Sequence, residues 1–266
     1  MALFDKIIYH WHFSKINIIK TILFNLKTLP FKTAIKFPIF LYGKIDIYFL
    51  QGKIEFQNCT VKKGMVKLGW NKEFLGTKNG GLILLNQKSK IIFKGNAEIS
   101  GNFLIRVGEN AILTIGNNFF LGSSSKIVCI HKISIGDGTL IAFESQIIDS
   151  DFHYIYDIEK ELIQSREREI VIGDFNWIGN RTTILKGTKT DIHTIVACCS
   201  ILRKDYIQTE SKNVILAGNP ATVAAKNKRR IVSLDLENKL IHFYKNSNNR
   251  LTDELKNEIK KSLEDN

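Results

Sequence analysis

The sequence predicts an all-β fold, a parallel β-solenoid with a helical segment at each end. Three observations point to this fold class. Branched apolar residues recur at every sixth position over much of the chain, and small or turn-forming residues follow many of them. The pattern also breaks at the stretch DSDFHYIYD (149–157), where a solenoid coil should continue. A regular scaffold interrupted by a charged insertion is typical of a functional loop carried by a rigid frame.

The six-residue period is most regular in the second half of the chain. Its members stand six apart without a gap: Ile172, Ile178, Ile184, Thr190, Val196 and Leu202. An amphipathic helix would repeat every 3.6 residues and a single strand every two, so neither explains the pattern. A short strand followed by a tight turn does explain it, and three such units make one triangular coil of about 18 residues. The branched residues should then point inward and fill the core.

Coils begin at five positions along this ladder: Phe93, Ile115, Ile135, Ile172 and Thr190. Pairs such as Gly136-Asp137 suit the corners, because glycine and aspartate tolerate tight turns. The step from Ile135 to Ile172 is much longer than the others, so an insertion of nearly one coil lies between Ile147 and Ile172. His153 falls in it, six residues after Ile147, where the next inward residue is due.

Three segments follow from these patterns. Residues 1–43 form an N-terminal helical segment, with amphipathic helices expected over 3–30. Residues 44–225 form the β-helix, including early irregular coils over 44–92 and a loop at about 149–170. Residues 226–266 form a basic, helical C-terminal segment. Helices at both ends would cap the solenoid, since open strand edges aggregate. The apolar and basic residues of 4–27 also suit peripheral docking on a membrane surface, and packing on the solenoid end is the alternative.

The net charge of +12 favours anionic partners but does not identify one. A phosphate-rich cofactor, an anionic glycan or an anionic membrane would each suit it, as would a plain lysine-rich surface. No recognisable nucleic-acid module is present, so no nucleic acid partner is predicted. The four cysteines lack metal-ligand spacing, and the N-terminus lacks a secretory signal. We expect that the protein binds no metal, that its thiols are reduced and that it is cytoplasmic. If it associates with a membrane peripherally, we expect it at the inner face.

Two stretches carry a family resemblance. IVIGDFNWIGNRTTILKGT (170–188) followed by NVILAGNPATVAAK (213–226) resembles the hexapeptide-repeat acyltransferases over about 90–225. The likeness is to the galactoside and maltose acetyltransferases and to the O-acetyltransferases of bacterial surface polysaccharides. The resemblance implies a left-handed parallel β-helix, a homotrimer, and acetyl-CoA lying in the groove between neighbouring subunits.

The resemblance also implies a catalytic histidine at the start of a loop extruded from the coil, which matches His153. A neutral imidazole near pH 7 is suited to remove the proton of an acceptor hydroxyl. A carboxylate bonded to the far ring nitrogen would fix its tautomer, and Asp151 and Asp149 are nearest in sequence. His153 as an ordinary loop residue and Asp151 as a turn former are the alternatives.

Further matches concern the acyl-CoA site. The residues implied to line it are, in chain order, Trp177, Asn180, Ala197, Cys198, Arg203, Lys204, Asn219 and Pro220. Arg203 and Lys204 are expected near the nucleotide phosphates. The family's small turn along pantetheine reads ACCS here, so the path is expected to be tighter. Cys198 and Cys199 are otherwise interpreted as packing residues, and His131 and His193 as surface residues.

These features predict an O-acetyltransferase that moves acetyl from acetyl-CoA to a sugar hydroxyl of a surface polysaccharide or its precursor. A substrate-contacting asparagine of galactoside acetyltransferases is replaced by Gly122-Ser123-Ser124, which leaves the acceptor open. One alternative is an N-acyltransferase on an amino sugar nucleotide, although no nucleotide-binding segment precedes the repeats. The other is a non-catalytic β-helical scaffold, which would not bind CoA.

Overall fold

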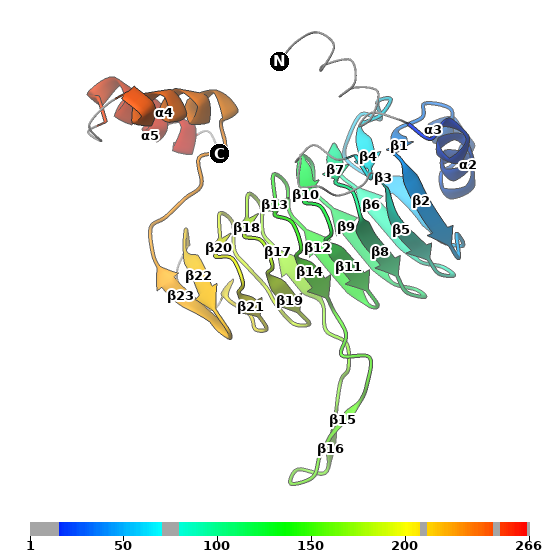
Figure 1. The fold of residues 1–266 in the computed structure, drawn as a ribbon. Coiled ribbons are helices and arrows are strands. Elements are labelled where there is room, and N and C mark those ends of the chain that lie inside the picture. Colours follow the sequence, from blue (N-terminus) through cyan, green and yellow to red (C-terminus); the bar gives the residue numbers. More distant parts are fainter. Residues whose placement is uncertain (1–15, 71–79, 208–211, 247–250, 265–266) are drawn as a thin grey trace.

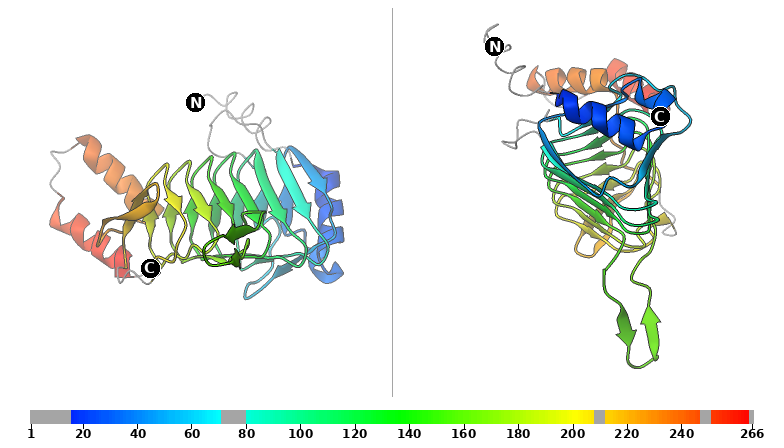
Figure 2. Two further views of the ribbon diagram at one scale, coloured as in Figure 1. Left: turned by 90° about the horizontal axis from the view of Figure 1, so that it is seen from below. Right: turned by 90° about the vertical axis from the view of Figure 1, so that its right-hand side faces the viewer.

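The computed structural model describes residues 16–70, 80–207, 212–246 and 251–264, and a parallel β-helix dominates them (Figure 1). Three sheets form the faces of a triangular prism, and the chain visits them in turn (Figure 2). The predicted fold class, an all-β left-handed parallel β-helix with helices near both ends, is confirmed. None of the described helices is long and apolar enough to cross a membrane.

The strands are short and their order follows the stacking of the coils. The nine-stranded sheet contains, in spatial order, β1 (Ile39–Leu41), β4 (Val66–Leu68), β7 (Ala97–Ile99), β10 (Phe119–Leu121), β13 (Leu140–Ile141), β18 (Trp177–Ile178), β20 (Ile195–Val196), β22 (Ile215–Gly218) and β23 (Ala221–Ala225). The seven-stranded sheet contains β2 (Lys44–Tyr48), β5 (Gly80–Leu85), β8 (Phe103–Val107), β11 (Lys126–Cys129), β14 (Gln146–Ile148), β19 (Thr183–Leu185) and β21 (Ile201–Leu202). The five-stranded sheet contains β3 (Lys53–Phe56), β6 (Lys90–Phe93), β9 (Ile112–Ile115), β12 (Lys132–Ile135) and β17 (Ile170–Ile172).

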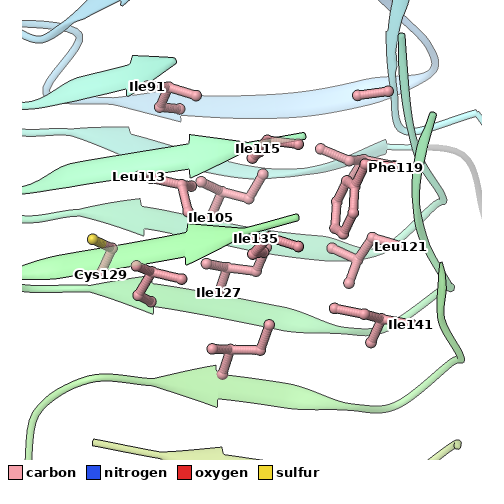
Figure 3. Close-up of a cluster of buried hydrophobic side chains, with 14 of the residues drawn as sticks. Ile91, Ile105, Leu113, Ile115, Phe119, Leu121, Ile127, Cys129, Ile135 and Ile141 are labelled. Atoms are coloured by element: carbon pink, nitrogen blue, oxygen red, sulfur yellow. The ribbon is translucent and has the colours of Figure 1, made fainter. Parts of the chain in front are cut away.

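The core is the column of side chains inside the prism. Strand register places Phe93, Ile115, Ile135 and Ile172 in one inward row, and each is at most 2% exposed. Figure 3 shows Ile115 and Ile135 stacked in this way beside the inward residues of the neighbouring faces. Burying one such side chain contributes about 1.5–3 kcal/mol, so the repeated row supplies stability coil after coil. Four of the coil starts predicted from the six-residue period thus lie in one buried row, and the described residues of 44–92 form strands of the earlier coils.

Thr190 stands at the inward position where the other coils have a large apolar residue. It is 1% exposed, and its hydroxyl donates to Asn176 Oδ1 at 2.7 Å and accepts from the backbone N–H of Gly173 at 3.2 Å. A buried hydroxyl is tolerated when it is hydrogen-bonded. On this face the ladder beyond β17 continues only through isolated bridges, beginning with Val171 and Lys189.

Helix α2 (Ile18–Thr28) lies across the first coil and caps it (Figure 2). The side-chain amide of Asn25 donates to the carbonyl of Ile39 at 2.8 Å, and the N–H of Leu41 donates to the hydroxyl of Thr21 at 3.1 Å. These bonds occupy edge groups of β1 that would otherwise be open to another strand. A short helix, α3 (Phe31–Ala34), follows. The solenoid begins at β1, inside the segment 1–43 expected to be helical, because β1 pairs with β4.

The other end of the prism is closed by a reversal of the chain. Strand β23 runs antiparallel to β22, so the sheet ends in a hairpin. The predicted C-terminal helices follow as α4 (Leu234–Asn246) and α5 (Asp253–Glu264). Leu236 and Leu255 are their most buried residues, 4% and 9% exposed. The part of the predicted N-terminal helices that falls on 1–15 lies outside the described residues.

Candidate functional site

An arm, residues 149–169, projects from the solenoid between β14 and β17 (Figure 1). It leaves the prism at the edge between the seven-stranded and five-stranded sheets, called here the second edge. Its two legs pair at the base, where Asp151 N–H donates to Arg166 O at 2.9 Å and Arg168 N–H donates to Asp149 O at 3.1 Å. Its far part is an antiparallel hairpin of β15 (Ile155–Asp157) and β16 (Leu162–Gln164). The insertion predicted from the broken period is therefore a defined arm.

The carboxylate of Asp149 fastens the start of the arm to the coil before it. The side chain is fully buried and accepts three backbone N–H groups, from Ile130 at 2.7 Å, His131 at 2.9 Å and Lys132 at 2.8 Å. Backbone donors of this kind compensate a buried carboxylate for lost water. Asp149 is thus committed to the preceding corner and does not reach His153.

Lys186 joins the two legs of the arm. Its ammonium lies 2.5 Å from Asp151 Oδ2 on one leg and donates to Ser165 O on the other at 2.7 Å. The side chain of Lys186 is only 10% exposed, whereas that of Asp151 is 36% exposed. Asp151 was expected to orient the histidine ring, but its carboxylate is paired with this lysine instead. Its observed position makes it part of the arm's attachment.

His153 lies just beyond this attachment and is exposed. Within the described part of the chain its ring makes no hydrogen bond. Its neighbours are held in place, since Phe152 lies 5.9 Å from the guanidinium of Arg106 and Tyr154 lies 5.2 Å from that of Arg166. Phe152 has a φ of 63°, a conformation uncommon for an aromatic residue. The imidazole is therefore presented to solvent on the second edge.

The first group of expected cofactor residues lies at the edge between the nine-stranded and seven-stranded sheets, called here the first edge. Asn180 and Cys198 occupy successive turns there, and Cys199 N–H donates to Asn180 O at 3.0 Å. A Cβ on Gly179 would meet the backbone nitrogen of Cys198 at 2.6 Å, so only glycine allows the turns to stack this closely. The turns consequently stack closely along this edge, to which Ala197 also contributes, and Arg181 of the same turn pairs with Glu144 at 2.6 Å.

Trp177, Asn219 and Pro220 extend this surface. Trp177 is 42% exposed and stands between Leu140 and Ile195 on the outer face of the nine-stranded sheet. Asn219 and Pro220 form the turn between β22 and β23, and the adjoining Gly218 N–H donates to Ser200 Oγ at 3.2 Å. Both turn residues are exposed. The aromatic ring and the last turn of the sheet therefore flank the first edge.

Arg203 and Lys204 belong to the other edge. Both are exposed and follow β21, so they lie on the second edge with the arm. The backbone carbonyl of Lys204 accepts from Lys189 N–H at 3.2 Å, which fixes the turn. Two strand spacings separate their coil from that of the arm, on the order of 10 Å along the axis. Their charges can thus serve a ligand that runs along the second edge.

One chain therefore divides the expected site between two edges of the prism. The first edge carries Trp177, Asn180, Ala197, Cys198, Asn219 and Pro220, and the second edge carries Asp151, His153, Arg203 and Lys204. The width of the seven-stranded sheet lies between them (Figure 2). A single copy does not bring the histidine against the first edge.

A groove of about 610 Å³ opens on the outer face of the nine-stranded sheet. Its lining includes Lys62, Lys63, Lys67, Asn96, Phe120 and Leu140. Lys67 is paired with Glu98 at 2.9 Å, whereas Lys62 and Lys63 make no ion pair within the described residues. Leu140 is the strand neighbour of both Phe120 and Trp177, so the groove runs toward the tryptophan. Its uncompensated charge is positive.

Two expectations about histidines and cysteines are wrong. His131 is exposed as expected, but His193 is 7% exposed, stacked on Phe175 at 5.2 Å with Arg229 Nη2 2.6 Å from its Nε2. The C-terminal segment that brings Arg229 covers this corner. Cys198 and Cys199 are exposed instead of packed, because they lie at a turn of the first edge.

All four cysteines lie in the described residues and all are free thiols. Cys129 is buried, and burial raises the pKa of its thiol. Among the described residues no group of histidine, cysteine, aspartate or glutamate side chains is arranged to hold a metal ion.

The sequence reasoning missed the part that Lys186 plays in the site, and it missed the anchoring role of Asp149. A signal for both exists. Side chains alternate in a strand, so residues two positions after the inward Ile184 and Ile147 should also point inward. Those residues are Lys186 and Asp149, and a charged residue at an inward position of an apolar ladder predicts a buried polar contact.

Comparisons with known proteins agree with this architecture. No family model matches the chain. A putative acetyltransferase of Saccharomyces cerevisiae is 32% identical over 149 residues, which cover 53% of this chain and 71% of the relative. A polysialic acid O-acetyltransferase of Escherichia coli O1:K1 is 26% identical over 133 residues, or 50% of this chain and 41% of the relative. The chain thus matches less than half the length of this second relative.

A solved structure, that of a polySia-specific acetyltransferase, shares the fold. It superimposes with a TM-score of 0.50 over 81% of this chain and 91% of its own, at 17% sequence identity.

Proposed function

The chain belongs to the hexapeptide-repeat acetyltransferases, and from this premise we propose that it moves an acetyl group from acetyl-CoA to a sugar hydroxyl. The acceptor in this proposal is a bacterial surface polysaccharide, from a capsule or a lipopolysaccharide, or its precursor. Similarity to a polysialic acid O-acetyltransferase supports an oxygen acceptor of this class. The observation that carries the proposal is an exposed histidine held at the base of a braced arm.

In the proposed reaction His153 is the general base. Its neutral imidazole takes the proton of the sugar hydroxyl while the oxygen attacks the thioester carbonyl. The tetrahedral intermediate then collapses, the acetyl–oxygen bond remains, and the carbon–sulfur bond breaks. The CoA thiolate takes the proton back from the imidazolium. Transfer within one complex of both substrates needs no covalent enzyme intermediate, and alignment of the two supplies much of the rate.

Asp151 acts in this scheme as a positioning residue. Its carboxylate is engaged by Lys186, which also binds the other leg of the arm at Ser165. Their contribution is to hold the start of the arm still, so that His153 meets both substrates at a constant distance. Orientation of the imidazole itself then falls to the bound substrates and to a neighbouring chain.

We propose that the active site forms between copies in a homotrimer. His153 and Arg203 lie on the second edge, whereas Trp177 and Asn180 lie on the first, so a site using all of them needs two chains. The arm also exposes apolar side chains with little to cover them in one copy, for example Ile158 at 84% and Ile163 at 68%. Exposed apolar surface of this kind marks an interaction site.

The groove beside Trp177 suits an anionic glycan as acceptor. Lys62 and Lys63, which make no ion pair within the described residues, provide positive charge, Phe120 provides an apolar face, and Asn96 provides an amide for hydroxyl groups. The row Phe120, Leu140, Trp177 is continuous in the sheet, so a saccharide in the groove would extend toward the acetyl donor. A cytoplasmic location is part of the proposal, because the adjacent exposed thiols Cys198 and Cys199 suit a reducing compartment.

An acetyl-transfer assay tests the reaction. The purified chain is incubated with labelled acetyl-CoA and either polysialic acid or an unrelated neutral glucan. We expect label in the anionic polysaccharide that mild alkali removes, because an ester is cleaved by it and an amide is not. Alkali-stable label would indicate N-acylation. Absence of transfer together with absence of CoA binding would favour the non-catalytic scaffold.

Mixing two inactive variants tests the shared site. His153→Ala removes the base, and Ala197→Trp obstructs the first edge. Random mixing of the two in trimers should leave about a quarter of the sites with both wild-type edges, so activity should return to that level. No recovery in verified mixed trimers would contradict sharing between chains, while leaving the reaction itself unaffected.

A further inference from the structure

The outer surface of the N-terminal cap is apolar. The residues concerned, called here the end patch, are Ile18, Ile19, Ile22, Leu23, Leu26, Phe31 and Ile35. They lie on α2, on α3 and on the residue that follows α3, and their exposed fractions range from 38% to 72%. No described segment packs over them. A cluster of exposed apolar side chains at one end of a molecule indicates an interaction site, whereas single exposed apolar side chains do not.

Helix α2 is inverted relative to a helix on the surface of a water-soluble core. The face it turns to the solenoid carries three polar residues, Thr21, Asn25 and Thr28, beside the single aromatic Phe24. The face it turns outward carries isoleucine and leucine. A soluble surface helix has the opposite arrangement, with the apolar stripe inward. The polar inner face is explained by capping of β1, and the apolar outer face is left for another environment.

The charged residues within the segment that forms the end patch have one sign. Residues 16–45 contain lysines and no aspartate or glutamate. Lys27, Lys32 and Lys36 are exposed beside the apolar residues. Apolar side chains flanked by lysines are the pattern of a helix that lies in the interface of an anionic bilayer. Each lysine near such a surface strengthens binding about fivefold at low ionic strength.

We propose that the end patch docks on an anionic lipid surface, with α2 in the plane of the interface. The helix lies across the end of the prism, so a membrane beneath it would leave the three sheet faces uncovered (Figure 2). The arm projects sideways from the prism (Figure 1), away from this end. Docking thus leaves His153 and the lysine-lined groove accessible. The proposal concerns location and does not depend on the reaction proposed above.

Vesicle flotation of the full-length chain tests the proposal. Vesicles of phosphatidylcholine with about a third phosphatidylglycerol are compared with vesicles of phosphatidylcholine alone, at low and at high salt. We expect the chain to float with the anionic vesicles, to bind the uncharged ones much less, and to lose part of its binding as salt screens the lysines.

A double variant and a matched control locate the contact. Ile19→Glu with Leu23→Glu changes two outward residues one helical turn apart, and each buried apolar side chain is worth about tenfold or more in binding. We expect vesicle binding to fall at least about tenfold for each of the two. Leu234→Glu with Ile241→Glu places the same two charges on exposed residues of α4 at the far end of the prism and should not change binding.

Three results would overturn the proposal. Wild-type chain that fails to float with anionic vesicles would show that the end patch serves another partner, such as residues 1–15 or a second copy. If the double variant floats with anionic vesicles as well as the wild type does, the membrane contact lies outside the end patch. A double variant that loses its folded state would show that the patch is buried in the free chain. Unchanged circular dichroism and elution volume exclude the last case.

Discussion

The bracing of the arm by Lys186 gives the sharpest quantitative prediction. Lys186→Met keeps the length of the side chain but removes its ammonium, and with it the ion pair to Asp151 and the bond to Ser165 O at 2.7 Å. A hydrogen bond to a charged group contributes about 1.5–3 kcal/mol. The carboxylate of Asp151 is 36% exposed and regains water, so little is added for an unpaired charge. We estimate a loss of about 2 kcal/mol, confined to the arm.

A change of about 2 kcal/mol multiplies the open population of the arm by about 30. Hydrogen exchange followed by mass spectrometry should therefore show roughly that acceleration in peptides covering 149–169, with the coils unchanged. Turnover should fall at least about tenfold, because a loosened base no longer meets its substrate in one geometry. The Michaelis constant for acetyl-CoA should change less.

Lys189→Met is the matched control for this experiment. Lys189 lies on the adjoining face, in register with Val171 of β17, is 43% exposed, and pairs with Asp205 at 3.5 Å. Exposed pairs of this kind contribute about 0–1 kcal/mol, and this one does not touch the arm. Unchanged exchange of the arm in Lys186→Met, or an equal effect of Lys189→Met, would refute the bracing role.

Three further predictions concern the ligand sites and the thiols. Arg203→Ala with Lys204→Ala should raise the Michaelis constant for acetyl-CoA with less effect on turnover, and an unchanged constant would remove both from the cofactor site. Lys62→Glu with Lys63→Glu should raise the Michaelis constant for an anionic acceptor at least about tenfold at low salt but not that for acetyl-CoA; equal use of the acceptor would exclude the groove. Iodoacetamide at pH 8 should label Cys198 and Cys199 but not Cys129 in the folded chain, because burial shields Cys129 and raises the pKa of its thiol; rapid labelling of Cys129 by mass spectrometry would contradict its position.

The core of the fold was predictable because a six-residue repeat reports the backbone path directly. Ile115, Ile135 and Ile172 were identified from spacing alone, and all three are buried in one row. The position of the arm was predictable as a break in the same repeat. Thr190 was recognised as an exception, but its bond to Asn176 joins residues 14 positions apart and could not be derived from the period.

Contacts between distant segments set the limit of prediction. His193 is buried because Arg229 reaches it from 36 positions away, and no local pattern announces that. Asp151 appeared to be the partner of His153 because the two are close in sequence, whereas the structure gives the carboxylate to Lys186. The repeat predicts how the coils stack, and therefore on which edge each site residue lies. It does not predict how many chains come together to form the site.

The central claim is that His153 performs the chemistry of acetyl transfer, and one variant tests it most directly. His153→Ala should lower turnover with acetyl-CoA and a polysaccharide acceptor by at least about 100-fold, the usual scale for a lost general base. The side chain is exposed and bonds to nothing in the described residues, so the variant should keep its unfolding temperature, its assembly state and its affinity for CoA. His153→Asn should behave in the same way, because an amide cannot take the proton. Acetyl transfer near the wild-type rate in His153→Ala would contradict the account and leave the arm with a structural role.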